Sequence, residues 1–242
     1  KRENVEKVVT LAKQQNIPIR IGVNAGSLEK DLLDKDIPLH EKMVESAMKH
    51  IQILEDLDFD KIKVSLKSSD VLTTIEAYRL MAQKVEYPLH LGVTEAGTLK
   101  GGLIKSSVGL GTLLAEGIGD TIRVSLTENP VEEVFAGYEI LKSLKLRQRG
   151  VNFVSCPTCG RTQIDLIGLA KKVETRFKNL DKNITIATMG CVVNGPGEAR
   201  HADFGIAGGI NEGYVFKKGE IVARVPESEL LDKLEEVINN SL

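Results

Sequence analysis

The stretch Ile62-Lys63-Val64-Ser65-Leu66-Lys67 alternates strictly between an aliphatic residue and a polar one. Successive side chains of a β-strand point to opposite faces, so this alternation predicts a strand with one apolar face and one polar face. The same alternation occurs in residues 19–23, 89–93 and 122–126, and helical patterns follow the four stretches in residues 41–57, 72–84, 105–116 and 131–144. Strands that alternate with helices predict a parallel α/β sheet.

One parity class of these strands is apolar throughout and the other is not, although buried parallel strands are usually apolar on both faces. The apolar class contains Ile19, Ile21, Val23, Ile62, Val64, Leu66, Leu89, Leu91, Val93, Ile122, Val124 and Leu126. The polar class contains Arg20, Gly22, Asn24, Lys63, Ser65, Lys67, His90, Gly92, Thr94, Arg123, Ser125 and Thr127. We therefore expect the apolar class to meet the helices and the polar class to face a common space.

In a (β/α) barrel that space is the lumen, which here would hold the four cations Arg20, Lys63, Lys67 and Arg123. Burying an unpaired charge costs several kcal/mol, so such a lumen is expected to be wet or to bind an anion. The alternative is an open sheet with one solvated face, where these cations need no ligand. Polar loops follow the carboxyl ends of the strands, where parallel α/β folds bind ligands, and they favour a site for a highly charged anion.

Four strands cannot close an eight-stranded barrel, so the fold class expected is α/β, with the second half of a TIM-like (β/α)8 barrel. Residues 2–15 already form an amphipathic helical pattern and Lys1 has no Met before it, so we expect that an N-terminal part is missing. A basic stretch that ends at Gly150 breaks the repeat. We therefore expect a half-barrel domain over residues 1–147 and a second domain over residues 148–242.

The second domain mixes strand and helix patterns in a different order. Strands are expected at residues 151–155, 184–189 and 204–207, with a hairpin of residues 214–217 and 220–225 and with helices at 164–179 and 227–239. This order predicts a small α+β domain.

All three cysteines of the chain lie in the second domain, in two strings rich in glycine and proline, Ser155-Cys156-Pro157-Thr158-Cys159-Gly160 and Gly190-Cys191-Val192-Val193-Asn194-Gly195-Pro196-Gly197-Glu198. A C-x-x-C pair can bind one metal or one face of a cluster, and Cys191 adds a ligand from another loop. His201, Glu198, water or substrate could complete the set.

An iron–sulfur cluster is the favoured interpretation of the three cysteines, but other interpretations stay open. A structural zinc normally has four Cys or His ligands, and a thioredoxin-like pair would leave Cys191 unexplained. Buried, inert thiols are the third alternative. An odd cysteine count without a visible signal peptide indicates a reducing, intracellular setting.

The composition excludes some partners. A net charge of −2 and only ten Phe and Tyr residues, without Trp, give no signature of nucleic-acid binding. No apolar run is long enough to span a bilayer.

Taken together, the chain resembles the family of 4-hydroxy-3-methylbut-2-enyl diphosphate synthases, iron–sulfur enzymes of the non-mevalonate isoprenoid pathway. The strings that carry the resemblance are Arg20-Ile21-Gly22-Val23-Asn24-Ala25-Gly26-Ser27, Cys156-Pro157-Thr158-Cys159 and the Cys191 string quoted above, which ends at Glu198. The resemblance implies a 4Fe-4S cluster held by Cys156, Cys159, Cys191 and the carboxylate of Glu198. It also implies an oxidoreductase that opens and dehydrates 2-C-methylerythritol 2,4-cyclodiphosphate with two electrons to give 4-hydroxy-3-methylbut-2-enyl diphosphate.

The resemblance also assigns residues and partners. It implies a catalytic role for Glu95, a barrel carboxylate placed for proton transfer, and for Glu198. The substrate-binding residues that it implies are Arg20, Asn24, Lys67, Arg123, Ser125 and Asn194. It implies a cytoplasmic homodimer that receives electrons from flavodoxin or ferredoxin. The family's barrel starts more than a hundred residues earlier, so its additional arginines are expected to be absent here.

Overall fold

The structure is a computed structural model that describes residues 2–191, 199–210 and 212–242. It divides into two units, Lys1–Arg147 and Gln148–Leu242, and each has its own hydrophobic core. Among the described residues, no helix is both long enough and apolar enough to cross a membrane.

The first unit alternates strands and helices, as the sequence predicts. Its elements are α1 (Arg2–Gln15), β1 (Ile19–Asn24), the 3₁₀ helix η1 (Ala25–Ser27), α2 (Lys30–Leu33), α3 (Leu39–Glu55), β2 (Ile62–Lys67), α4 (Val71–Ala82), β3 (His90–Leu91), α5 (Leu99–Ala115), β4 (Thr121–Ile122) and α6 (Pro130–Ser143). α5 begins six residues before its predicted start. The prediction was late because the first turn contains Gly101 and Gly102, which weaken the helical pattern in the sequence. The short α2 was not predicted.

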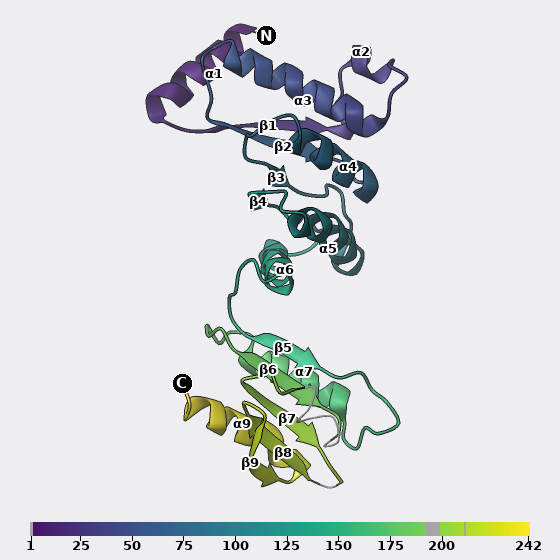
Figure 1. Cartoon of the computed structure of the whole chain (residues 1–242), viewed down its shortest axis with the longest axis vertical. Helices are drawn as coiled ribbons and strands as arrows, with labels where there is room; N and C mark the ends of the chain where they lie inside the picture. Colours follow the sequence, from purple (N-terminus) through teal and green to yellow (C-terminus); the bar gives the residue numbers. More distant parts are fainter. Residues whose placement is uncertain (1, 192–198, 211) are drawn as a thin grey trace. The chain divides into compact units, whose positions relative to one another are not determined.

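The strands of the first unit are parallel and follow one another in chain order (Figure 1). β1 pairs with β2, β3 pairs with β4, and an isolated bridge between Val64 and Leu89 joins the two pairs. α3 contacts α4, α4 contacts α5, and α5 contacts α6, so the helices cover the strands in series. Sequential strands with helices in series fit part of a (β/α) barrel.

β3 and β4 are shorter than the predicted strands at residues 89–93 and 122–126. Only two residues of each form a regular ladder, His90 with Thr121 and Leu91 with Ile122. The chain still runs alongside its neighbour beyond the ladder, because the Arg123 N–H donates to the Leu91 carbonyl over 2.8 Å. The strand direction is therefore kept while the regular pairing ends.

The apolar parity class forms the core between strands and helices, as predicted. Nine of its twelve members are buried: Ile21, Val23, Ile62, Val64, Leu66, Leu89, Leu91, Val93 and Val124. Ile19, Ile122 and Leu126 are partly buried against the same core. The remaining parity class is thus turned away from the helices, since strand side chains alternate between faces.

Tyr78 of α4 fills a gap in the backbone pairing between β2 and β3. Its side chain is fully buried. Its hydroxyl accepts the Leu66 N–H at 2.9 Å and donates to the His90 carbonyl. Burial raises the pKa of Tyr78 to about 12, so the hydroxyl keeps its proton at neutral pH. One side chain therefore takes the place of a direct backbone bond.

The described residues of the second unit form a mixed sheet and two α-helices, as the expected α+β domain requires. Its elements are β5 (Asn152–Ser155), α7 (Leu166–Phe177), β6 (Thr185–Met189), β7 (Phe204–Gly208), β8 (Gly213–Lys217), β9 (Glu220–Val225), the 3₁₀ helix η2 (Glu227–Glu229) and α9 (Leu230–Asn239). The strand order is β5-β6-β7-β8-β9, parallel up to β7 and antiparallel from β7 to β9. The β8–β9 hairpin turns at Lys218 and Gly219, whose φ angles of 50° and 84° match a type I′ turn.

We expect Tyr78→Phe to lower the free energy of unfolding of the first unit by about 1–3 kcal/mol, because the Leu66 N–H and the His90 carbonyl lose their buried partner. Urea denaturation followed by far-UV circular dichroism measures the change. Tyr87→Phe is the matched control, because the Tyr87 hydroxyl bonds to Glu55 at an exposed site. Equal losses in the two variants would contradict the bridging role.

Candidate functional site

The cations of the polar parity class gather on one face of the first unit. The register of β1 and β2 places Arg20 opposite Lys63 and Asn24 opposite Lys67. Arg123 follows β4 by one residue. Lys63, Lys67 and Arg123 are half-buried and Arg20 is exposed. We call Arg20, Lys63, Lys67 and Arg123 the cationic face.

Two glycines give the long cationic side chains room to lie across the sheet. A Cβ on Gly22 would lie 3.5 Å from both Cε and Nζ of Lys67, so the lysine leans over β1. A Cβ on Gly92 would lie 3.0 Å from the Arg123 carbonyl oxygen and 3.7 Å from its Nε. The space above both glycines thus holds Lys67 and Arg123, and a ligand would meet these side chains first.

The positively charged side chains of the cationic face repel one another. Burial, followed by repulsion from Arg123 and Arg20, lowers the pKa of Lys67 below its ordinary value. None of the four cations forms a salt bridge with a carboxylate of the described residues. A bound anion would relieve this repulsion, because each positive charge would gain an opposite partner.

The loops after the strands lie side by side at one end of the sheet. The Thr94 N–H donates to the Ser68 carbonyl at 3.0 Å, and the Thr127 N–H donates to the Gly97 carbonyl at 2.9 Å. Asn24 and Glu95 are exposed at this end, and Ser125 is half-buried. These bonds bring the ends of β2, β3 and β4 together.

Glu95 has a backbone conformation that is uncommon for a residue with a side chain. Its φ angle is 52°, in the left-handed region. Such conformations persist only where the surrounding structure fixes them, and they cluster at functional sites. The structure therefore gives Glu95 an orientation that a regular strand end would not.

Lys63 and His90 also lie on this face, although the family resemblance did not include them among the substrate-binding residues. Thr121 Oγ1 lies 2.8 Å from Nδ1 of His90, and Nε2 of His90 is buried without a hydrogen-bond partner among the described residues. Burial, followed by repulsion from the four cations, lowers the pKa of His90. The parity pattern already placed both residues on this face, so that signal alone could have identified them.

The second unit places Cys156 and Cys191 at the same end of its sheet. Ser155 lies opposite Thr188 in the parallel pair β5–β6, so Cys156 and Cys191 follow neighbouring strand ends. The Gly190 N–H lies 3.1 Å from Cys156 Sγ and donates to it. Cys191 is buried, Cys156 is half-buried and Cys159 is exposed.

The surroundings of these thiols fit thiolate ligands. The pKa of Cys159 is lowered chiefly by a hydrogen bond from the backbone N–H of Arg161, with further help from the Arg161 and Thr162 side chains. The thiolate is the form that binds metals, and N–H donors to sulfur are typical of iron–sulfur sites. Gly190 permits the close approach of Thr162, three residues after Cys159, because a Cβ at Gly190 would lie 3.1 Å from Thr162 Oγ1.

Asn194 and Glu198, expected at the substrate and the cluster, lie outside the described residues. In the part of the chain that the structure describes, no group of three His, Cys, Asp or Glu residues is arranged to hold a single metal ion. In a 4Fe-4S cluster each thiolate binds a different iron atom, so this finding concerns mononuclear sites alone.

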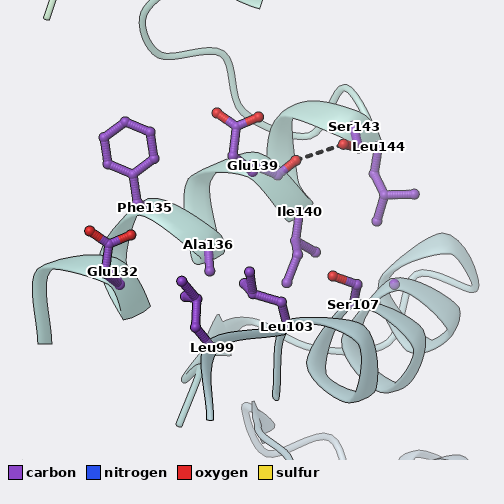
Figure 2. A pocket seen from close by; sticks show the side chains of 11 residues that line it. Leu99, Leu103, Ser107, Glu132, Phe135, Ala136, Glu139, Ile140, Ser143 and Leu144 are labelled. Carbon is purple, nitrogen blue, oxygen red and sulfur yellow. Dashed lines mark hydrogen bonds between the residues drawn. The ribbon is translucent and has the colours of Figure 1, made fainter. Parts of the chain in front are cut away.

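A pocket of about 410 Å³ lies between α5 and α6 of the first unit. Figure 2 shows Leu103 of α5 and Ile140 of α6 pointing toward each other, with Glu132 and Glu139 nearby. The pocket shares no residue with the cationic face, and its carboxylates would repel an anion. The pocket is therefore not the candidate site for an anion, although it is large enough to hold a small molecule.

We expect Arg123→Ala to raise the pKa of Lys67, because one repelling charge is removed. The pKa should stay below its ordinary value, because burial is the larger cause. NMR titration of the Lys67 side chain, assigned with Lys67→Arg, measures it. Arg79→Ala removes a distant arginine that pairs with Glu116 and should leave Lys67 unchanged. An unshifted Lys67 in Arg123→Ala would contradict the electrostatic coupling.

Comparison with known proteins identifies both units. Residues 1–138 match the model of the GcpE TIM-barrel domain, and residues 152–240 match the GcpE protein C-terminal domain. The curated relatives include 4-hydroxy-3-methylbut-2-en-1-yl diphosphate synthases (flavodoxin) from three bacteria. The Geobacter sulfurreducens enzyme is 63% identical over 96% of this chain, that of Clostridium perfringens 61% over 98%, and that of Clostridium acetobutylicum 60% over 99%.

The chain spans 66%, 68% and 69% of the lengths of these three relatives. One family model covers the cationic face and the other covers the three cysteines, and the alignments with the three relatives each cover at least 96% of the chain. The chain therefore belongs to the GcpE family, and the three relatives named above are 4-hydroxy-3-methylbut-2-en-1-yl diphosphate synthases.

Proposed function

We propose that this chain carries out the reaction for which its relatives are named, the reductive opening and dehydration of 2-C-methylerythritol 2,4-cyclodiphosphate to 4-hydroxy-3-methylbut-2-enyl diphosphate. As a member of this family it is an oxidoreductase of isoprenoid-precursor synthesis. The observation that carries the proposal is the cationic face, four cations without a carboxylate partner among the described residues, joined in one chain to a three-cysteine unit. Such a face suits a substrate with two phosphate groups.

In this proposal the first unit binds and orients the substrate. Arg20, Lys67 and Arg123 hold the diphosphate by charge-assisted hydrogen bonds, which are stronger than neutral ones. Asn24 and Ser125 add neutral hydrogen bonds. The same cations stabilise the negative charge that the phosphate oxygen gains when its bond to carbon breaks. Glu95, held at the loop end, moves the proton that the loss of water requires.

The second unit would hold the cofactor. Cys156, Cys159 and Cys191 are three ligands of a 4Fe-4S cluster, and Glu198 is the fourth. When bound, the cluster supplies the two electrons that no amino-acid side chain can supply. The Gly190 N–H that donates to Cys156 Sγ supports this assignment, since hydrogen bonds to sulfur tune such sites. Asn194 would contact the substrate beside the cluster.

The finer features of the assembly follow the same proposal. The four strands of the first unit would be the second half of an eight-stranded barrel, supported by their sequential order and by the description of the matched family model. The electron donor would be flavodoxin, as in the relatives' names, or a ferredoxin. The protein would be a cytoplasmic homodimer.

Replacing the proposed cluster ligands should distinguish residues that retain iron from a residue that is needed for turnover. We expect Cys156→Ser or Cys191→Ser to lose most of the iron of anaerobically purified protein, because a thiolate ligand is removed. Glu198→Ala should keep iron but change the electron paramagnetic resonance spectrum and abolish turnover. Iron analysis and spectroscopy on the same samples measure both effects. A Glu198→Ala variant with normal activity would exclude Glu198 as a ligand needed for catalysis.

Removing a cation should weaken substrate binding. Charge-assisted hydrogen bonds are worth about 1.5–3 kcal/mol, so Lys67→Ala or Arg123→Ala should weaken binding of the cyclic diphosphate by about tenfold or more. Isothermal titration calorimetry measures the dissociation constant. Lys84→Ala, at an exposed position after α4, is the control and should bind normally. Normal binding by both Lys67→Ala and Arg123→Ala would show that the anion binds elsewhere.

A further inference from the structure

The ring of His90 has one satisfied nitrogen and one unsatisfied nitrogen. Nδ1 lies 2.8 Å from the Thr121 hydroxyl, on the neighbouring strand. Nε2 is shielded from solvent and has no hydrogen-bond partner within the described ranges. A buried polar atom without a partner is costly, and in native proteins it often marks a place where a ligand or water binds. The ring therefore keeps one donor or acceptor position unused.

Charges of one sign surround this ring. Arg20 on β1, Lys63 and Lys67 on β2, and Arg123 after β4 all act on it by electrostatic repulsion. From α4, the neutral Tyr78 hydroxyl donates to the His90 carbonyl. Burial and repulsion from these cations lower the pKa of His90 and favour the neutral ring. The ring stays uncharged while nothing offsets the four cations.

Two other histidines show the opposite arrangement. His40 lies 3.0 Å from a carboxylate oxygen of Glu76, and His50 lies 3.3 Å from one of Glu29. Neither is flanked by the cationic face. They are internal controls for any change that an anion causes at His90.

Thr121 can satisfy His90 in either protonation state. A hydroxyl both donates and accepts, so it can donate to a bare Nδ1 or accept from Nδ1–H. When the ring is protonated, both nitrogens donate, and Nδ1 still has an acceptor in Thr121 Oγ1. Protonation then demands only that Nε2–H find an acceptor, and a phosphate oxygen is a strong one.

We propose that His90 is the proton-accepting member of the cationic face: neutral while the face is empty, it takes up one proton when a diphosphate-type anion binds, and its Nε2–H donates to that anion. The proposal rests on the proposed function, since it takes the diphosphate of the substrate as the ligand. It adds a fifth positive charge that exists only in the bound state. His90 would thereby contact substrate without adding to the repulsion in the empty site.

The direction of the pH dependence follows from this coupling. Anion binding favours the charged ring, so the pKa of His90 is higher in the bound protein than in the empty protein. Affinity for the anion is therefore greatest below the pKa of the empty state and falls as pH rises through the pKa of the bound state. Each unit between the two values makes the affinity about tenfold greater at the acidic end than at the basic end.

The test is NMR of the imidazole nitrogens, which report tautomer and charge directly. The chain has four histidines, so the spectrum is simple. Two probes are used: the cyclic diphosphate and sulfate. Each phosphorus of the cyclic diphosphate has one ester bond, one anhydride bond and one strongly acidic group, so neither probe titrates near neutral pH. At pH 7 we expect a neutral His90 in the empty protein and a charged His90 at saturation with either probe, while His40 and His50 stay unchanged.

His90→Asn provides the matched variant, because its amide lies at the position of Nδ1 and can still bond to Thr121 but cannot take up a proton. Its affinity for the cyclic diphosphate should match that of the wild type at high pH and should not rise at low pH. A His90 that stays neutral at saturation, or that is already charged in the empty protein, would overturn the proposal even if the variant does not fold. Turnover is assayed separately. If His90 becomes protonated when sulfate binds but the protein does not turn over the cyclic diphosphate, the proposed function is wrong and this inference still holds.

Discussion

Repulsion among unpaired cations on one face of a parallel sheet is the constraint on which the first unit depends. Arg20 and Lys63 are direct neighbours in the β1–β2 register, and Lys67 and Arg123 lie across Gly22 and Gly92. Nothing on that face offsets their charge among the described residues. The stabilising free energy that offsets this repulsion must therefore come from the opposite face of the sheet, where apolar strand residues pack against the helices.

Tyr78 connects that core to the face. Its hydroxyl bridges the backbones of β2 and β3, and its acceptor is the carbonyl of His90, whose ring is repelled by the four cations. A buried aromatic residue thus fixes the strand on which the histidine stands. Rigid support of this kind allows like charges to be held in place before a ligand arrives, which is how preorganised sites lower the cost of binding.

Strand register organises the second unit in the same way. The pairing of Ser155 with Thr188 sets Cys156 beside the turn at Gly190, which precedes Cys191. Cys156 and Gly190, which are 34 residues apart in the sequence, thereby come into contact. Separate α/β units that carry the charge and the thiols match a reaction in which anion binding and electron supply are distinct tasks, as proposed for the chain.

The sequence by itself determined the strand parity, the order of elements and the cysteine strings, because period-two alternation and ligand spacing are local properties of the chain. It set the start of α5 too late, since Gly101 and Gly102 obscure the local pattern there, and it overestimated the lengths of β3 and β4, whose regular pairing ends after two residues. Only the tertiary structure decided that Lys67 lies over Gly22, that Thr121 faces one nitrogen of His90, and that the other nitrogen has no partner in the described residues. These contacts join strands that are 30 to 45 residues apart, so they depend on register and packing, which no local pattern encodes.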